Sequence, residues 1–411
     1  MSQKNNIRLL LSFVGTLLLA GCQNNNVEPP VVNEQDGTTM ELMPISTRFL
    51  DVQPWGGSRA DYFPYPDGYV PYDVLYPAPV LEYRKIGVFM TPDRKTPAGD
   101  FIYEGDNKWK STILVKEGHT YYVYGFMPRE GAVDAEVNPL PGETTYAPGA
   151  DLFIEKYTSL TPADVCVIVG VRYATEEEET AGHPLDMVPL GQFEYIGHEE
   201  GKNRIFVLLK HLYAGIHFKV QIDPEYHKLR NIKVKKVELT AHEIPEFINL
   251  GVRLTANSEG KDPTLDPTNP SVSNIEYGEV LGDNGLPLTP TDVTVTIYEN
   301  ADGYEVLETE PDGFLGCYVP GRYAFTLRTT YDVYDKNQKK DDEGNPVFDG
   351  EGNPVYNLVR EDCVAENFIN RSIIPDLEAG EVFTVNMLVK PTYLYQMSEP
   401  DLDNPKLITT P

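Results

Sequence analysis

Short apolar segments recur along the whole 411-residue chain, and they constrain its fold more than any other feature. They are rich in Val, Ile, Tyr, Phe and Thr, and Gly, Pro, Asn and Asp lie between them. No long segment carries apolar residues at the spacing of a capped amphipathic helix. The sequence therefore predicts an all-β protein built from antiparallel sandwiches. The clearest of these segments are residues 86–90, 121–127, 165–171, 205–209, 215–222, 232–239, 293–298, 322–328 and 382–389.

The number of expected strands divides the chain into two halves. A cut near residue 210 leaves about seven strands on each side, enough for one sandwich in each half. Residues 256–274 are more linker-like in composition, but a cut there would make the two halves very unequal. We therefore predict two tandem sandwich domains, over residues 45–210 and 211–395, followed by a C-terminal tail over residues 396–411. In the segment 232–239, one extra Lys interrupts the alternation and indicates a β-bulge.

The N-terminus has the pattern of a lipoprotein signal peptide over residues 1–21. Lys4 and Arg8 precede an apolar stretch, Leu9–Leu19, that is too short to span a bilayer as a helix. The sequence Leu-Ala-Gly-Cys that ends at Cys22 matches the lipobox of bacterial lipoproteins. In those proteins the cysteine thiol receives a diacylglycerol, and acyl chains anchor the protein to the membrane. Cys22 is therefore the predicted lipidation site.

The polar residues that follow, 22–44, are rich in Asn, Glu and Pro and are predicted to be a flexible tether. Gln23 after the lipidated cysteine suggests the outer membrane as the destination. The chain has 34 Lys and Arg against 63 Asp and Glu, a net charge of −29. This balance excludes a nucleic-acid binder, which needs a basic surface, and disfavours docking on anionic lipids through side chains.

Motifs for catalysis or metal binding are absent from the sequence. It contains no Gly-x-Ser-x-Gly, His-Glu-x-x-His, Walker A or Gly-x-Gly-x-x-Gly pattern. His211 and His217 would share a face of one strand, but two ligands make a weak metal site. We therefore expect no enzyme activity, no cofactor and no metal.

Three cysteines remain after Cys22. Cys166 lies in an apolar segment and is expected to be a packed free thiol. Cys317 and Cys363 both fall in the second predicted domain, and the cell envelope is oxidising. A disulfide between them is plausible, but spacing alone does not decide the pairing.

A segment dense in aromatic residues and prolines, from Trp55 to Tyr83, admits two interpretations. Its rings can pack inward against the first sandwich, which is the commoner fate of such residues. They can also form a platform that stacks on sugars, because flat amphipathic rings suit binding surfaces. The second interpretation describes a surface glycan-binding lipoprotein with a glycan or host-surface receptor. The aromatic residues are Trp55, Tyr62, Phe63, Tyr65, Tyr69, Tyr72, Tyr76 and Tyr83.

Several segments together resemble the fimbrillin family, the lipoprotein pilins of Bacteroidales. They keep the family's order over roughly residues 45–395. With the lipobox and the two-sandwich prediction, they make up a moderately specific set. The matching segments are residues 85–89, a strand with Trp109, and residues 121–128, 206–214, 232–239 and 379–386.

The resemblance implies two transthyretin-like, Greek-key sandwich domains and a structural role in a surface fimbria that supports adhesion. In this family, a trypsin-like surface protease cuts after an Arg and removes the lipid with the first strand. The groove left behind accepts a strand from another pilin subunit. Here the removable strand would be residues 45–52, with core residues Ile45, Phe49 and Leu50. The cut would fall at Arg59-Ala60, with Arg48 as the alternative.

The same resemblance assigns the donor strand to the C-terminal part of the chain. The donor would come from residues 382–389 and 393–407, both apolar enough to fill a groove. The aromatic segment 55–83 departs from the family, so a shaft, a tip and an accessory position all stay open. The expected location is the outer membrane by lipid anchor, and then the cell-surface fimbria. The donor residues are Val382, Val385, Leu388, Tyr393 and Tyr395.

Overall fold

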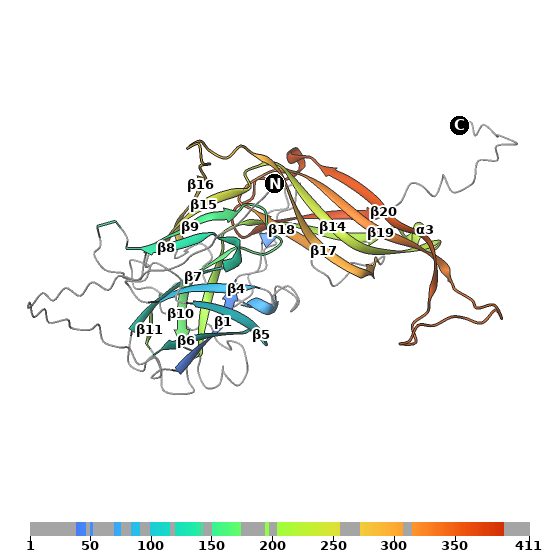
Figure 1. Cartoon of the computed structure of the whole chain (residues 1–411), viewed down its shortest axis with the longest axis horizontal. Helices are drawn as coiled ribbons and strands as arrows, with labels where there is room; N and C mark the ends of the chain where they lie inside the picture. Colours follow the sequence, from blue (N-terminus) through green and yellow to red (C-terminus); the bar gives the residue numbers. More distant parts are fainter. Residues whose placement is uncertain are drawn as a thin grey trace, which may run out of the picture. The chain divides into compact units, whose positions relative to one another are not determined.

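The computed structural model of the chain confirms the all-β class (Figure 1). The described part contains one α-helix, the four-residue α3 (Pro224–His227), and the 3₁₀ turns η2 (Tyr72–Val74), η3 (Arg129–Gly131) and η4 (Arg371–Ile373). No helix in that part is long and apolar enough to cross a membrane. The structure describes residues 38–46, 50–51, 70–74, 84–90, 99–115, 120–139, 141–142, 150–173, 194–196, 204–254, 272–306 and 315–389.

Two sheets enclose the first apolar core. One sheet follows the order β10-β12-β1-β6-β5-β4-β7-β11, with β3 on β1, and β7 also pairs with β10. The facing sheet has the order β16-β15-β9-β8. The strands are β1 (Thr38–Ser46), β3 (Val70–Pro71), β4 (Lys85–Met90), β5 (Gly99–Gly105), β6 (Lys108–Val115), β7 (Thr120–Met127), β8 (Asp134–Asn138), β9 (Ala150–Thr158), β10 (Cys166–Tyr173), β11 (Glu194–Ile196), β12 (Arg204–His211), β15 (Phe247–Leu254) and β16 (Val272–Glu279).

Two further sheets enclose a second apolar core. Their orders are β18-β13-β21-β2 and β17-β14-β19-β20. The strands are β2 (Leu50–Asp51), β13 (Ala214–Ile222), β14 (Arg230–Ile244), β17 (Thr291–Glu305), β18 (Leu315–Val319), β19 (Ala324–Gln338), β20 (Tyr356–Ile369) and β21 (Glu381–Val389).

Alternating side chains explain why these segments become strands that cover a core. In β15 every second residue is buried, from Ile248 to Leu254, while the residues between them are more exposed. Period-two patterning places one set of side chains on each face of the sheet. The expected bulge in β14 is confirmed, because the register shifts between Val234 and Lys236 against both neighbouring strands.

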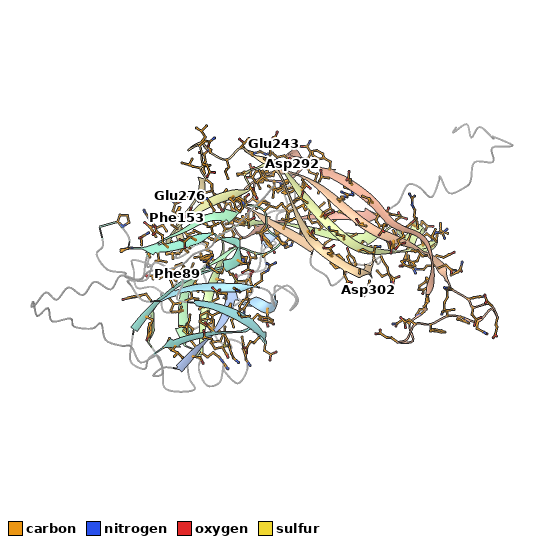
Figure 2. The ribbon with its side chains drawn as sticks, in the orientation of Figure 1. Phe89, Phe153, Glu243, Glu276, Asp292 and Asp302 are labelled. Atoms are coloured by element: carbon orange, nitrogen blue, oxygen red, sulfur yellow. The ribbon has the colours of Figure 1, made fainter. Side chains whose placement is uncertain are left out.

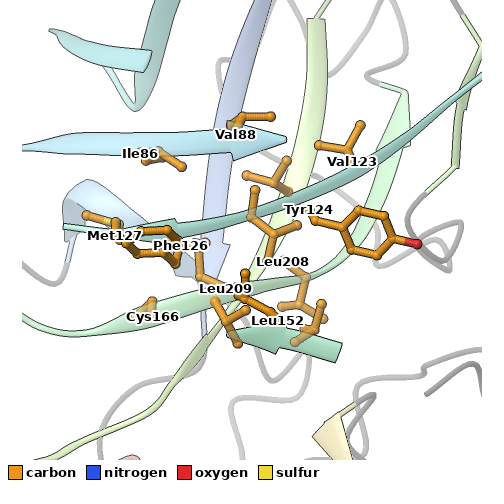
Figure 3. Close-up of a cluster of buried hydrophobic side chains, with 14 of the residues drawn as sticks. Ile86, Val88, Val123, Tyr124, Phe126, Met127, Leu152, Cys166, Leu208 and Leu209 are labelled. Atoms are coloured by element: carbon orange, nitrogen blue, oxygen red, sulfur yellow. The ribbon is translucent and has the colours of Figure 1, made fainter. Parts of the chain in front are cut away.

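The first core is made mainly of aliphatic and aromatic side chains from the larger sheet (Figure 3). Phe126, Cys166 and Leu208 lie in it, and Trp109 and Phe89 are fully buried. Most of the described acidic residues lie outside the cores, whereas Asp164, Asp332 and Glu381 are buried. The acidic residues labelled in Figure 2 are exposed, namely Glu243, Glu276, Asp292 and Asp302. This distribution keeps the excess negative charge in water.

Three strand pairs depart from the antiparallel expectation. β1 pairs with β12 in parallel, and β21 pairs in parallel with both β13 and β2. Alternating polarity cannot distinguish the two pairing directions, because both use the same period of two. The parallel pairs bring strands from the two ends of the chain into sheets formed by its middle.

The first strand lies earlier than predicted. β1 begins at Thr38, inside the segment expected to be a tether, and it ends at Ser46. The single strand expected over residues 45–52 is therefore wrong. Leu50 and Asp51 belong to β2, which lies in a sheet of the second core.

The domain boundary near residue 210 stays a prediction. β15 and β16 follow that position in sequence, yet β15 pairs with β9 and contributes to the first core. β14 packs in the second core. The chain therefore enters the second core and returns to the first one.

Candidate functional site

β1 is an inner strand of the larger sheet, although it comes first in the described chain. Residues 41–46 pair in parallel with residues 204–209 of β12. On its other side, β1 pairs with β6 through Leu42 and Trp109, and then with β3 at Ile45 and Ser46. Without β1, β12 and β6 would each lose a neighbour, leaving a gap inside the sheet.

The side chains of β1 are buried on both faces of the sheet. Met40, Leu42, Met43 and Ile45 are at most 2% exposed, and all belong to the first core. Leu42 and Met43 are consecutive, so they point to opposite faces. Complete burial of such a side chain contributes about 1.5–3 kcal/mol. β1 is therefore a main part of the core and not a covering strand.

A proline within an inner strand requires a local explanation, because it cannot donate a backbone hydrogen bond. Pro44 lies where the pairing of β1 with β6 ends and the pairing with β3 begins. Its carbonyl accepts a 2.6 Å hydrogen bond from the side-chain amide of Asn107. Asn107 is in the turn between β5 and β6 at a φ of 55°, a conformation that Asn adopts more readily than most residues.

Two polar contacts attach the ends of the paired part of β1 to β12. Glu41 forms an ion pair with Arg204, its register partner. Ser46 is completely buried, and its hydroxyl lies 3.2 Å from Nε2 of His211 at the end of β12. Each contact requires β1 to be in register, so the two specify its alignment.

The expected removable strand, cleavage sites and lipidation site are only partly described. Ile45 is a core residue of β1, as predicted, and the backbone of Leu50 belongs to β2. Cys22, Arg48, Phe49, Arg59 and Ala60 lie outside the described residues.

One of the expected donor segments is folded into the second core. Residues 382–389 lie in β21, where Val382 and Phe383 are at most 5% exposed. Val385 is partly buried, and Leu388 is 58% exposed. The other segment, with Tyr393 and Tyr395, lies outside the described residues.

Tyr72 is the aromatic residue of segment 55–83 whose side chain is described, and it packs inward. It is 1% exposed, and its hydroxyl donates a 3.0 Å hydrogen bond to Asp164. Burial, and then the charge of Asp164, raise the pKa of its hydroxyl, so it remains a donor. The other seven aromatic residues of the segment lie outside the described part of the chain.

His211 and His217 are on different strands, so the idea of two ligands on one strand is wrong. His211 ends β12, and His217 lies in β13 with its ring edge-on to Tyr318, at a centroid distance of 6.1 Å. Burial lowers the pKa of His217 to about 3, although the charge of Asp164 opposes this shift.

We expect His217 to make the protein less stable as the pH falls below 6.5. In the unfolded chain the ring takes up a proton near that pH, whereas in the fold it stays neutral down to about pH 3. Protonation therefore favours unfolding, by about 1.4 kcal/mol for each pH unit over this interval. Urea unfolding at pH 7, 6 and 5 should show a smaller pH dependence for His217→Phe, which keeps the ring contact. His227→Gln serves as control, and equal pH slopes in His217→Phe and wild type would contradict the assignment.

All three cysteines in the described part are buried, and none of them forms a disulfide there. Cys166 lies in the first core, as expected. Cys317 of β18 and Cys363 of β20 both line the second core but belong to different sheets, and the structure holds no bond between them. Burial raises the pKa of the Cys317 thiol, which makes it a poor nucleophile in the folded protein.

No sequence motif predicted a role for Asp164, which lies close to His211 and Cys166. His211 is far from Asp164 and Cys166 in sequence, and its proximity to them depends on the pairing of β10 with β12. One local pattern indicated part of this cluster. Asp164 and Cys166 are two residues apart at the start of a strand, so their side chains can lie on the same face of the sheet.

Comparisons with known proteins give similarities at low identity. No protein-family model and no curated protein matches the chain. A candidate cell adhesion protein from Bacteroides fragilis has 11% identity and a TM-score of 0.32, covering 86% of this chain and 94% of its own. A fimbrial protein from Bacteroides vulgatus has 10% identity and a TM-score of 0.28, and the match covers 85% of this chain and 95% of that protein. A candidate cell adhesion protein from Bacteroides ovatus has 10% identity and a TM-score of 0.27, and the match covers 86% of this chain and 93% of that protein.

Proposed function

We propose that this chain is a structural subunit of a surface fimbria, in a shaft, tip or accessory position, and that it assembles by strand exchange. The observation that carries the proposal is the place of β1. A strand from the N-terminal end lies inside a sheet, parallel to β12, with four apolar side chains buried in the core. A segment that is inside a core but at one end of the chain can be replaced by an equivalent strand.

The exchange begins with a cut that separates β1 from the rest of the chain. Arg48 and Arg59 both follow β1 in sequence and precede the next described strand of that sheet, β3. A trypsin-like surface protease acting there would leave β1 held by non-covalent contacts alone. Its release also removes the lipid proposed on Cys22, so the subunit leaves the outer membrane for the fimbria.

The groove left by β1 is suited to a donor strand. β12 and β6 would present unpaired backbone N–H and C=O groups, and the sites of Leu42 and Met43 would form apolar pockets on both faces. Addition of a strand to such an edge gives affinity through the backbone and specificity through the pockets. A head-to-tail contact of this kind does not close on itself and produces a filament.

We assign the donor to residues 390–411 in preference to β21. Val382 and Phe383 are buried in the second core, and β21 pairs with both β13 and β2. Release of β21 would therefore open the second core. The residues after Val389 include Tyr393, Leu394 and Tyr395, which are apolar enough to fill the pockets.

The glycan-binding interpretation stays a prediction. Tyr72 contributes to the first core and not to an exposed platform. No described residue is assigned a catalytic role. The partners proposed here are other pilin subunits and a trypsin-like protease, with adhesion to a surface receptor as the role of the assembled fimbria.

Limited trypsin digestion tests the proposal. The chain from residue 23 is digested at a low protease ratio and followed by N-terminal sequencing and negative-stain microscopy. We expect a cut after Arg48 or Arg59 and the appearance of filaments or oligomers. If the chain is cut cleanly, forms no oligomers and binds a strand from another pilin, we would assign it a tip or accessory position in the fimbria.

Two control variants make the test specific. Arg48→Gln with Arg59→Gln should stay uncut in this region and monomeric. A chain that ends at Val389 should be cut normally but should not polymerise. Normal filaments from the truncated chain would exclude residues 390–411 as the donor, and filaments from the uncut double variant would exclude strand removal as the trigger.

A further inference from the structure

Three buried side chains contact one carboxylate oxygen of Asp164, and one of them, His211, also contacts Ser46 at the end of β1. Oδ2 of Asp164 lies 2.9 Å from Nδ1 of His211, 3.0 Å from Sγ of Cys166 and 3.0 Å from the Tyr72 hydroxyl. Nδ1 of His211 is also 3.4 Å from Sγ of Cys166. Asp164, Cys166 and His211 are at most 2% exposed. We call these three residues the Asp164 cluster.

The second oxygen of Asp164 is a separate observation at the same place. Oδ1 is buried and has no hydrogen-bond partner among the residues that the structure describes. A buried carboxylate oxygen without a partner is costly and requires an explanation, such as an ion. One oxygen of the Asp164 carboxylate therefore lacks a hydrogen bond inside the described part of the protein.

We propose that the Asp164 cluster binds a zinc ion. It offers one oxygen, one sulfur and one imidazole nitrogen, all of which are donor types that bind Zn²⁺ in proteins. With metal–ligand bonds of about 2.0–2.3 Å, tetrahedral ligands lie about 3.2–3.6 Å apart. The separations in the structure, 2.9, 3.0 and 3.4 Å, need to widen only slightly.

The charges and protons balance in such a site. The Asp164 carboxylate and the Cys166 thiolate together neutralise Zn²⁺, so no net charge is left in the core. Formation of the Zn–S bond releases the thiol proton to solvent. His211 stays neutral: Nδ1 binds the metal through its lone pair, and its proton moves to Nε2, which then donates to Ser46 Oγ, 3.2 Å away. A water molecule or the Tyr72 hydroxyl completes the fourth position.

The donor set selects against the hard cations. Ca²⁺ takes six to eight oxygen ligands and Mg²⁺ keeps several waters, whereas this cluster has one carboxylate and lies in an apolar core. A thiolate and an imidazole suit zinc and other borderline or soft metals. All three ligands belong to the part of the chain that follows β1, so they would remain in the subunit after the proposed strand exchange, whereas Ser46 would leave with β1.

Refolding with and without metal tests the site. Because the cluster is buried, the chain from residue 23 is unfolded in urea with reductant and refolded with Zn²⁺, Co²⁺ or EDTA. It is then passed through a chelating resin, which removes metal bound to surface acids. We expect about one metal per chain by elemental analysis, and in the Co²⁺ form an intense near-ultraviolet thiolate-to-cobalt band.

Matched cysteine variants identify the ligand. Cys166→Ser should lose the cobalt band and retain at least tenfold less zinc, whereas Cys317→Ser, also a buried thiol, should behave as wild type. Ser46→Ala should weaken zinc binding by about 10–100-fold, because Ser46 orients the imidazole. Circular dichroism confirms that each variant is folded.

Three outcomes would overturn the proposal. The first is wild-type protein that retains no zinc after refolding, which would make the cluster a hydrogen-bond network only. The second is zinc retention by Cys166→Ser equal to wild type. The third is a cobalt form without a thiolate band, which would place the metal on surface carboxylates.

Discussion

A chain that starts at residue 49, and so lacks β1, is expected to form oligomers when it is purified alone. The gap between β12 and β6 then has two unpaired strand edges and exposes the pockets of four buried apolar side chains. Such an edge is a template for strand addition, and residues 390–411 of a second copy can occupy it. Size-exclusion chromatography with light scattering, and negative-stain microscopy, measure the result.

A peptide with residues 37–48 should hold the same chain in the monomeric state when it is present during refolding. It restores the register of β1 with β12 and refills the core, so no groove is left for a second copy. A control peptide with Leu42→Asp and Met43→Asp should have no effect, because each change would bury a charge. A chain lacking β1 that remains a folded monomer and does not bind the 37–48 peptide would contradict both the role of β1 and the groove.

Replacement of Asp164 by Ala is expected to lower the free energy of unfolding by about 3–5 kcal/mol in protein treated with a chelator. The change leaves the Tyr72 hydroxyl, the Cys166 thiol and the His211 ring without their shared acceptor inside the core. Burial alone would raise the pKa of Asp164, but the nearby His211 and the hydrogen bonds lower it, so the carboxylate stays ionised at neutral pH. Urea unfolding at pH 7 measures the loss.

The matched control is Asp151→Ala, which also removes an aspartate from an ion pair. Asp151 contacts Arg253 at 2.9 and 3.1 Å, but both side chains are substantially exposed. Exposed pairs contribute about 0–1 kcal/mol, so this variant should be close to wild type. Equal losses for the two variants would show that burial does not determine the contribution of Asp164.

Local sequence patterns predicted much of the fold correctly. The all-β class, the bulge in β14 and the burial of Cys166 all follow from short-range properties, namely β propensity, period-two alternation and an interrupted apolar pattern. Each depends on a few neighbouring residues, so no knowledge of distant partners is needed.

The same reasoning failed at β1 because its strand is specified by distant partners. Residues 38–44 contain two threonines, Glu41 and Pro44, which resemble a polar tether. Glu41 forms an ion pair with Arg204, and the side-chain amide of Asn107 donates a hydrogen bond to the carbonyl of Pro44. Both faces of β1 are buried, so its apolar residues do not alternate, and Glu41 and Pro44 interrupt them so that they form no continuous apolar segment.

The amino-acid sequence by itself determined that this chain forms strands, because backbone preference and side-chain alternation are local. Only the tertiary structure decided which strands are neighbours, because pairing joins residues that are distant in sequence, such as Glu41 and Arg204. It placed β1 inside a sheet and in parallel with β12. It also brought Asp164, Cys166 and His211 to one point in the core, since β10 and β12 pair there.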